Sequence, residues 1–183
     1  PAYWPIGSLG ESIGIDFERL PGEYSSWRFC TELYVLKGGA TYLLASDLAV
    51  RHRVLTEDEV SLTFVQRLMP FMAARPEDLT GTMVFLTSVP SRLAALGGLR
   101  GYRRALIECG LACAELSAAV AQNDQFEWIW ETEFYDDAAM RLIGVDGVER
   151  VVTHIGYQRT VETAEVEVVS EDHAGLSSDH GEA

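Results

Sequence analysis

Cysteine and histidine side chains are the first residues whose spacing can be tested for chemistry. Cys109 and Cys113 are four residues apart, which places both thiols on one face of a predicted helix. A metal pair there would need His or Asp partners, and none is close in the sequence, so we predict small core residues and no metal site. His52 and His154 match no motif, and an ordinary core or surface histidine is the default interpretation of each.

Two tryptophans, Trp128 and Trp130, alternate in a run that is typical of a strand, so both indoles point to one face. Such a pair can stack on a base or a peptide, or it can pack in the core. Core packing is favoured, because an indole buries a large apolar surface.

The elements that would position these side chains follow from hydrophobic periodicity. The predicted strands are 31–37, 81–87, 126–132 and 148–156, with a further short strand and turn in 40–50. The predicted helices are 56–74, which Thr56 would cap and Pro70 would interrupt, 101–121 and 136–143. Helix 101–121 is rich in small residues, and we expect it in a protein–protein interface or in the central core. This order of elements predicts an α+β layered domain.

Composition divides the chain into three parts. Residues 1–24, rich in Gly, Pro and aromatic residues, predict an irregular N-terminal arm, and residues 25–160 form a single domain. Residues 161–183 form an acidic C-terminal extension with seven acidic residues and no base. Within it, 163–169 alternates valine with glutamate like an edge strand, and we expect this segment to pair with the sheet of a partner chain.

Bulk composition excludes several classes of protein. The formal net charge is −14, so nucleic acid and anionic membrane are not expected as partners. No apolar run reaches the roughly 18 residues of a membrane span, and residues 1–5 do not resemble a signal peptide. Three cysteines give no paired framework, which predicts a cytoplasmic protein.

Five short motifs occur in a fixed order along the domain. They are Glu-Leu-Tyr-Val-Leu at 32–36, the strand and arginine of 84–92, Arg-Gly-Tyr-Arg opening a helix at 100–103, Phe-Tyr-Asp-Asp at 134–137, and Leu-Ile-Gly-Val-Asp at 142–146. A closing strand to Gly156 follows them.

Together these motifs resemble the nitroreductase superfamily, and most closely its SagB-type thiazole/oxazole (azoline) peptide dehydrogenases. The resemblance implies a nitroreductase-like α+β fold with a central mixed sheet covered by helices, and a C-terminal strand swapped between subunits. It also implies FMN as the cofactor, bound at a dimer interface, and the oxidation of azoline rings in a peptide.

On this resemblance, some residues could contact FMN and one could take part in catalysis. The FMN candidates are Ser25, Ser26, Arg28, Arg100, Arg103 and Arg159, and the catalytic candidate is Tyr102. The serines could hydrogen-bond the flavin rim, and the arginines could meet its phosphate or pyrimidine carbonyls. Ordinary turn residues, ion-pair residues and a packing tyrosine are the alternative interpretations of the same positions.

Other family positions have lost their functional residues. The family's Lys-Tyr pair falls on Leu96 and Gly97, which cannot transfer protons. Its flavin-edge loop falls on 131–133, where Glu131 and Glu133 would oppose the negative charge of a reduced flavin. The arginine-bearing helix that grips the FMN phosphate has no match in this sequence.

We therefore predict a nitroreductase-fold subunit of an FMN-dependent oxidoreductase complex in peptide or natural-product modification, with a degenerate active site of its own. The expected partner is a complete nitroreductase-like subunit in a hetero-oligomer, or a second copy in a homodimer, and FMN would be bound together with that partner. The alternatives are an independently active azoline-type dehydrogenase and a non-catalytic binding or scaffold module.

Overall fold

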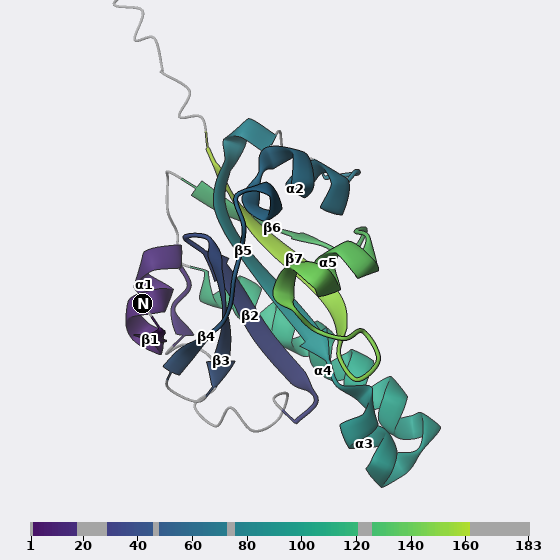
Figure 1. The fold of residues 1–183 in the computed structure, drawn as a ribbon. Helices are drawn as coiled ribbons and strands as arrows, with labels where there is room; N and C mark the ends of the chain where they lie inside the picture. The colour runs from purple at the N-terminus through teal and green to yellow at the C-terminus, as the bar shows by residue number, and fades with distance from the viewer. Residues whose placement is uncertain (1, 18–28, 46–47, 73–75, 121–125, 162–183) are drawn as a thin grey trace, which may run out of the picture.

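A computed structural model describes residues 2–17, 29–45, 48–72, 76–120 and 126–161 (Figure 1). The strands in this part of the chain are β1 (Tyr3–Pro5), β2 (Thr31–Lys37), β3 (Ala40–Ala45), β4 (Leu48–Val54), β5 (Leu79–Ser88), β6 (Phe126–Glu131) and β7 (Val151–Thr160). The helices are α1 (Ile6–Ile13), α2 (Leu62–Leu68), α3 (Pro90–Gly97), α4 (Leu99–Ala119) and α5 (Asp136–Ile143). Two 3₁₀ turns, η2 (Asp58–Val60) and η3 (Pro76–Asp78), flank α2.

The strands form one sheet in the order β1-β4-β3-β2-β5-β7-β6. The predicted α+β class is confirmed, and each pair of neighbouring strands is antiparallel, where the resemblance implied a mixed sheet. Short connections such as the Gly38–Gly39 turn between β2 and β3 favour antiparallel pairing. At one end of the sheet Thr31 of β2 pairs with Ser88 of β5, which pairs with Val151 of β7. We call this the α3 end, because α3 follows β5 directly.

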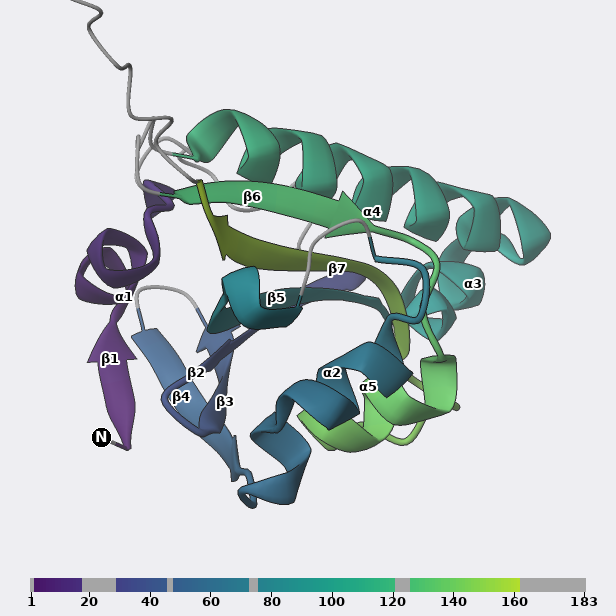
Figure 2. The same cartoon turned by 90° about the horizontal axis from the view of Figure 1, so that it is seen from above.

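Helices cover both faces of the sheet, with α4 on one face and α2 and α5 on the other (Figure 2). The first face carries a core that joins α1, α4 and the sheet and includes Leu33, Leu86 and Leu116. The second face carries a core that includes Phe85 and Leu142. Neighbouring residues of β5 point into different cores because strand side chains alternate between the two faces, so the central strands are apolar throughout.

Residues 3–13 correct the prediction of an irregular arm, because β1 and α1 occupy them. The α1 helix buries Leu9 and Ile13 completely in the first core. A Cβ at Gly10 would lie 2.4 Å from the backbone oxygen of Ile15, so glycine permits the chain to return closely over the helix. Glycine lowers helix propensity, so this packing rather than local preference stabilises α1.

Most predicted elements are confirmed, with shifts at their ends. The bounds of β2 and α5 are those predicted, and α4 begins and ends two residues earlier than 101–121. The structure has the shorter helix α2 in place of the predicted helix 56–74. Ser61, not Thr56, caps this helix by accepting a hydrogen bond from the Phe64 backbone N–H at 3.2 Å. The α3 helix was not predicted, although Pro90 at its first position is a typical start signal. The predicted strand 163–169 lies outside the described residues.

Candidate functional site

The α3–α4 hairpin projects from the α3 end of the sheet and carries the arginine–tyrosine motif (Figure 1). Gly101 lets the two helices touch, because a Cβ there would lie 2.1 Å from the backbone oxygen of Leu93. Arg100, Tyr102 and Arg103 lie on the first turns of α4 with their side chains exposed. They are therefore accessible to a ligand or to another protein.

A charged network centred on Glu32 of β2 lies at the α3 end of the sheet, next to this hairpin. Arg92 of α3 donates to its Oε1 at 2.6 Å, and Arg150, next to β7, donates to its Oε2 at 2.8 Å. The Tyr34 hydroxyl donates to the same Oε2 at 3.1 Å. Burial would raise the pKa of Glu32, but hydrogen bonds from Arg150 and Arg92 outweigh burial and leave that pKa below its usual value. Both guanidinium groups are thus engaged in holding β2, α3 and β7 together.

A second polar cluster is buried between α4 and the start of β2. Glu108, only 5% exposed, accepts the Cys30 thiol at 2.9 Å and the Arg104 Nε–H at 3.0 Å. The Thr31 hydroxyl lies 3.2 Å from the sulfur of Cys109. Burial, together with the Glu108 carboxylate, raises the pKa of Cys30 to about 12, so this thiol stays protonated and is not a nucleophile. The cluster positions α4 on β2 and supplies no reactive group.

The structure brings some of the predicted cofactor residues together and separates others. Arg100 and Arg103 are neighbours on α4, beside the candidate Tyr102. Arg159 lies near the opposite end of the sheet, where its guanidinium pairs with Glu127 of β6. The remaining candidates, Ser25, Ser26 and Arg28, lie outside the described residues.

The predicted cofactor positions can be compared with what FMN would need, which is cations for its phosphate and neutral donors around its ring. Arg100 and Arg103 are exposed and form no ion pair within the described part of the chain, so they suit a phosphate. The segment after β6 instead presents Glu131, half-buried, and Glu133, exposed. Among the predicted positions, Arg100 and Arg103 therefore fit a phosphate, whereas Glu131 and Glu133 do not fit the edge of a reduced flavin.

Sequence reasoning missed the two polar networks. Glu32 gave a signal, because a carboxylate in an apolar strand needs a partner when it is buried. Its partners Arg92 and Arg150 are 60 and 118 residues away in the chain. No local pattern reveals contacts at that separation.

The tryptophans and cysteines take the core positions that were predicted. Trp128 and Trp130 stack with ring centroids 6.3 Å apart, pack against the first core, and the Trp128 indole donates to the Ile13 backbone oxygen at 3.1 Å. Cys109 is buried and Cys113 half-buried. Among the described residues, no three His, Cys, Asp or Glu side chains are arranged to hold a metal ion. Within the same residues, no helix is long and apolar enough to cross a membrane.

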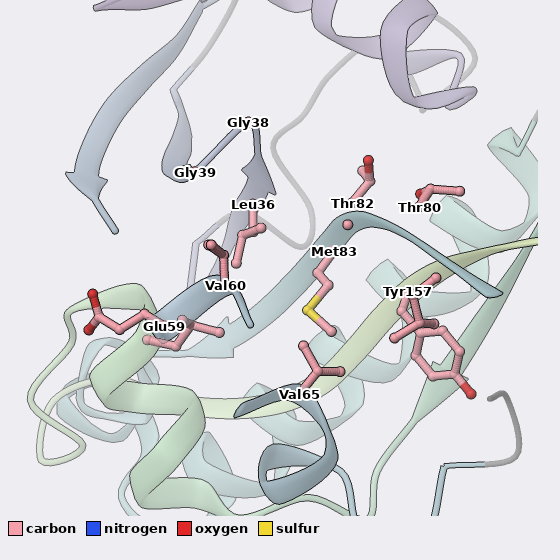
Figure 3. Close-up of a pocket in the computed structure, with 13 residues that line it drawn as sticks. Leu36, Gly38, Gly39, Glu59, Val60, Val65, Thr80, Thr82, Met83 and Tyr157 are labelled. Atoms are coloured by element: carbon pink, nitrogen blue, oxygen red, sulfur yellow. The ribbon is translucent and has the colours of Figure 1, made fainter. Parts of the chain in front are cut away.

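A cavity of about 280 Å³ lies at the opposite end of the sheet (Figure 3). Leu36, Val65, Met83 and Tyr157 form much of its apolar wall. Its one carboxylate, Glu59, is engaged with Arg53 and with the backbone N–H of Thr56. None of the predicted site residues lines this cavity, so it is not the candidate site.

Comparisons with known proteins add evidence on the fold. No family model and no curated protein matches the sequence. The structure is similar to a chain of the E. coli microcin synthetase McbBCD complex with truncated pro-MccB17 bound, with a TM-score of 0.65 and 13% identity, over 85% of this chain and 64% of that one. It is also similar to a protein of Anabaena variabilis ATCC 29413 assigned as a nitroreductase, with a TM-score of 0.58 and 17% identity, over 70% of this chain and 26% of that one.

These similarities show the fold, and the chain spans only part of the length of both neighbours. The chain is an α+β protein with a nitroreductase-like fold, as its motifs implied. At this level of identity, activity, cofactor and partners do not follow from the fold.

Proposed function

We propose that this chain is a nitroreductase-fold subunit of an FMN-dependent oxidoreductase complex that modifies a peptide or another natural product. The observation that carries the proposal is the outward face of α4. Leu106, Ile107 and Leu111 are exposed there, on the same helix as the candidate residues Arg100, Tyr102 and Arg103. Contiguous exposed apolar residues of this kind mark interaction sites.

The site itself supports a shared rather than an independent activity. Leu96 and Gly97 stand where the family has its proton-transferring pair, and neither can exchange a proton. Tyr102 is the described residue nearest to that role, and we propose that it faces substrate or flavin only in the assembled complex. Arg100 and Arg103 would then offer charge to the FMN phosphate, while the partner supplies the neutral donors.

The outward face of α4 is suited to close helix packing. Gly110 has open space where a side chain would lie, and Ala114 and Ala118 are exposed small residues on the next turns. A partner helix could therefore approach the α4 backbone closely, with Ile107 and Leu111 as apolar anchors. The partner we propose is a complete nitroreductase-like subunit, and a second copy of this chain is the alternative.

The likeness to a chain of a microcin synthetase complex supports the proposed setting. That similar chain belongs to the McbBCD complex, which has truncated pro-MccB17 bound. An independently active dehydrogenase is the second candidate function, and Arg100 and Arg103, which are available for a phosphate, favour it. A binding module without flavin is the third.

Titration of the purified chain with FMN, followed by flavin fluorescence, tests the proposal. The chain alone should bind with a dissociation constant above about 1 μM, because neutral ring contacts are missing. Copurification with nitroreductase-like proteins that carry an arginine-bearing N-terminal helix should yield a yellow complex. Sub-micromolar binding by the single chain would contradict the shared site and establish an independent flavoprotein.

The variant Ile107→Glu separates assembly from folding in the same experiment. It should abolish the yellow complex while the chain keeps its melting temperature, since the residue is exposed in the isolated chain. Val54→Glu, at an equally exposed apolar position on β4, is the matched control and should leave the complex intact.

A further inference from the structure

The cavity at the end of the sheet opposite α3 is a second place where a small molecule could bind (Figure 3). Its volume is about 280 Å³. That is room for about nine water-sized groups, at about 30 Å³ each. Protein interiors contain few voids larger than one water molecule, because side chains pack as densely as in crystals. A cavity of this size is therefore better explained by a ligand than by imperfect packing.

Strand β5 leaves its regular pairing where it borders the cavity. Three residues, 80–82, lie between its paired residues Leu79 and Met83, whereas β7 has one residue between their two partners. The pairing of β5 with β2 also ends at Met83. A bulge of this kind leaves peptide groups without ladder partners, and bulges are frequent next to active sites. The backbone of 80–82 can therefore hydrogen-bond a bound molecule.

Three glycines among the lining residues keep the backbone accessible from the cavity. Gly38 and Gly39 form the turn between β2 and β3, and Gly81 lies in the β5 bulge. A Cβ at any of the three would meet no heavy atom within 4 Å, so close packing does not require glycine there. Glycine inside a strand often marks a place where a ligand approaches the backbone closely. A flat molecule can thus lie directly against these peptide groups.

The remaining wall of the cavity is apolar and includes an aromatic ring. Met83 and Val65 point toward each other in Figure 3, and the fully buried Tyr157 adds its ring. Methionine sulfur and aromatic rings both make favourable contacts with a bound aromatic ring. An apolar cavity of about 150 Å³ holds one benzene ring, so about twice that volume suits two fused rings.

Charge in the cavity favours a neutral ligand. Glu59 is the one charged residue among those that line it, and its carboxylate accepts hydrogen bonds from the Thr56 backbone N–H at 2.9 Å and from Arg53 at 2.6 Å. The hydrogen bond from Thr56 lowers the pKa of Glu59, so this group is ionised at neutral pH. It would repel a carboxylate or phosphate, and the lining residues provide no Lys, Arg or His to balance one.

We propose that this cavity binds an uncharged two-ring aromatic molecule. The rings lie between Met83, Val65 and Tyr157, and one polar ring atom hydrogen-bonds the backbone of 80–82. Indole has this size, this shape and one N–H donor, so it is the probe for the site. The inference does not depend on flavin or on the exposed face of α4.

Titration of the full chain with indole, without FMN, tests the site. The readout is the NMR signal of the Met83 methyl group, which lies at the cavity. Indole should shift this signal saturably with a dissociation constant below about 1 mM. Indole-3-carboxylate should bind at least about 10-fold more weakly, because its negative charge would be buried near Glu59. In Glu59→Gln this preference for indole should fall below about 3-fold, since the repelling charge is gone.

The variant Val60→Trp places an indole ring of the protein itself at the cavity. Val60 is 40% exposed, so the chain should fold, and it should bind added indole at least about 10-fold more weakly than wild type. Val148→Trp adds the same ring at a position that is 86% exposed and does not line the cavity. This control should bind indole within about 2-fold of wild type, because a distant surface change leaves the cavity as it was. Thermal melting checks that each variant folds.

Three results would overturn the proposal. The first is the absence of a saturable Met83 shift up to the solubility limit of indole. The second is wild-type affinity in Val60→Trp, and the third is equal binding of indole and indole-3-carboxylate by the wild type. FMN binding is measured in a separate titration without indole, so failure here leaves the proposed function to its own test.

Discussion

Both faces of α4 carry apolar residues, but the inward face is buried and the outward face is exposed. On the inward face Ala105, Cys109, Ala112, Leu116 and Ala119 are each at most 2% exposed. On the outward face Leu106 is 48%, Ile107 63% and Leu111 54% exposed. The inward residues are mostly small, so the helix lies close on the sheet, whereas the outward face combines these three large side chains with the small residues Gly110, Ala114 and Ala118.

This difference indicates that apolar residues on one helix can serve two purposes, packing in the core of the chain and packing against a partner. The inward face completes the core of the isolated chain. The outward face has no counterpart in the described residues, and exposed apolar residues that lie together are typical of an interaction site. The sequence expectation of an interface or a central core is thus met by two faces: the inward one lies in the core, and we propose the outward one as the interface.

The substitution Ala112→Arg has the largest expected effect and tests the burial of the inward face of α4. The side chain of Ala112 is fully buried in the first core, so the substitution places an unpaired guanidinium there. We expect a loss of about 4 kcal/mol or more in the free energy of unfolding, measured by urea denaturation. Ala114→Arg, on the exposed side of the same helix, is the control and should unfold like wild type. Equal stability of the two variants would mean that α4 is not seated on the sheet as described.

Leu116 and Leu111 compare the inward and outward faces of α4 with the same residue type. Leu116→Ala removes a fully buried side chain and should cost about 2–5 kcal/mol. Leu111→Ala, five positions earlier on the outward face, should change the free energy of unfolding by no more than about 0.5 kcal/mol in the isolated chain. If a large loss followed Leu111→Ala, the outward face would already be covered within one chain, and the interface proposal would lose its support.

The smallest expected effect concerns Glu108, a charged residue among the apolar residues on the inward face of α4. Glu108→Gln keeps an acceptor for the Cys30 thiol but weakens the contact with Arg104. We expect a loss of about 1–2 kcal/mol, because hydrogen bonds to charged groups contribute on that order. Glu115→Gln serves as the comparison, because half-buried Glu115 lies on the same helix and its Oε2 has no hydrogen-bond partner among the described residues. A Glu108→Gln variant as stable as wild type would show that the cluster does not hold α4 in place.

Local sequence pattern was sufficient where an element depends on its own residues. The bounds of β2 were predicted because a run of residues typical of a strand ends at the Gly38–Gly39 turn. The bounds of α5 were predicted because Asp136 and Asp137 lie in its first turn and Gly144 ends it with a φ of 75°. The nitroreductase-like fold was indicated differently, by the resemblance of the five motifs to a known family.

Local pattern failed where an element depends on distant packing. The α1 helix is short and glycine-rich, and only its burial against α4 and the sheet stabilises it. The Glu32 network joins residues up to 118 positions apart, and no periodicity records that contact.

Charge, helix and strand periods, and the motif set of the candidate site were therefore determined by the sequence itself, because each arises from neighbouring residues. The tertiary structure alone decided which arginines remain available. It engages Arg92, Arg150 and Arg159 with carboxylates of other elements, while Arg104 pairs with Glu108 one turn further along α4, and it leaves Arg100 and Arg103 exposed. The physical reason is that ion pairing depends on distances in space, which are set only when the sheet and its helices pack together.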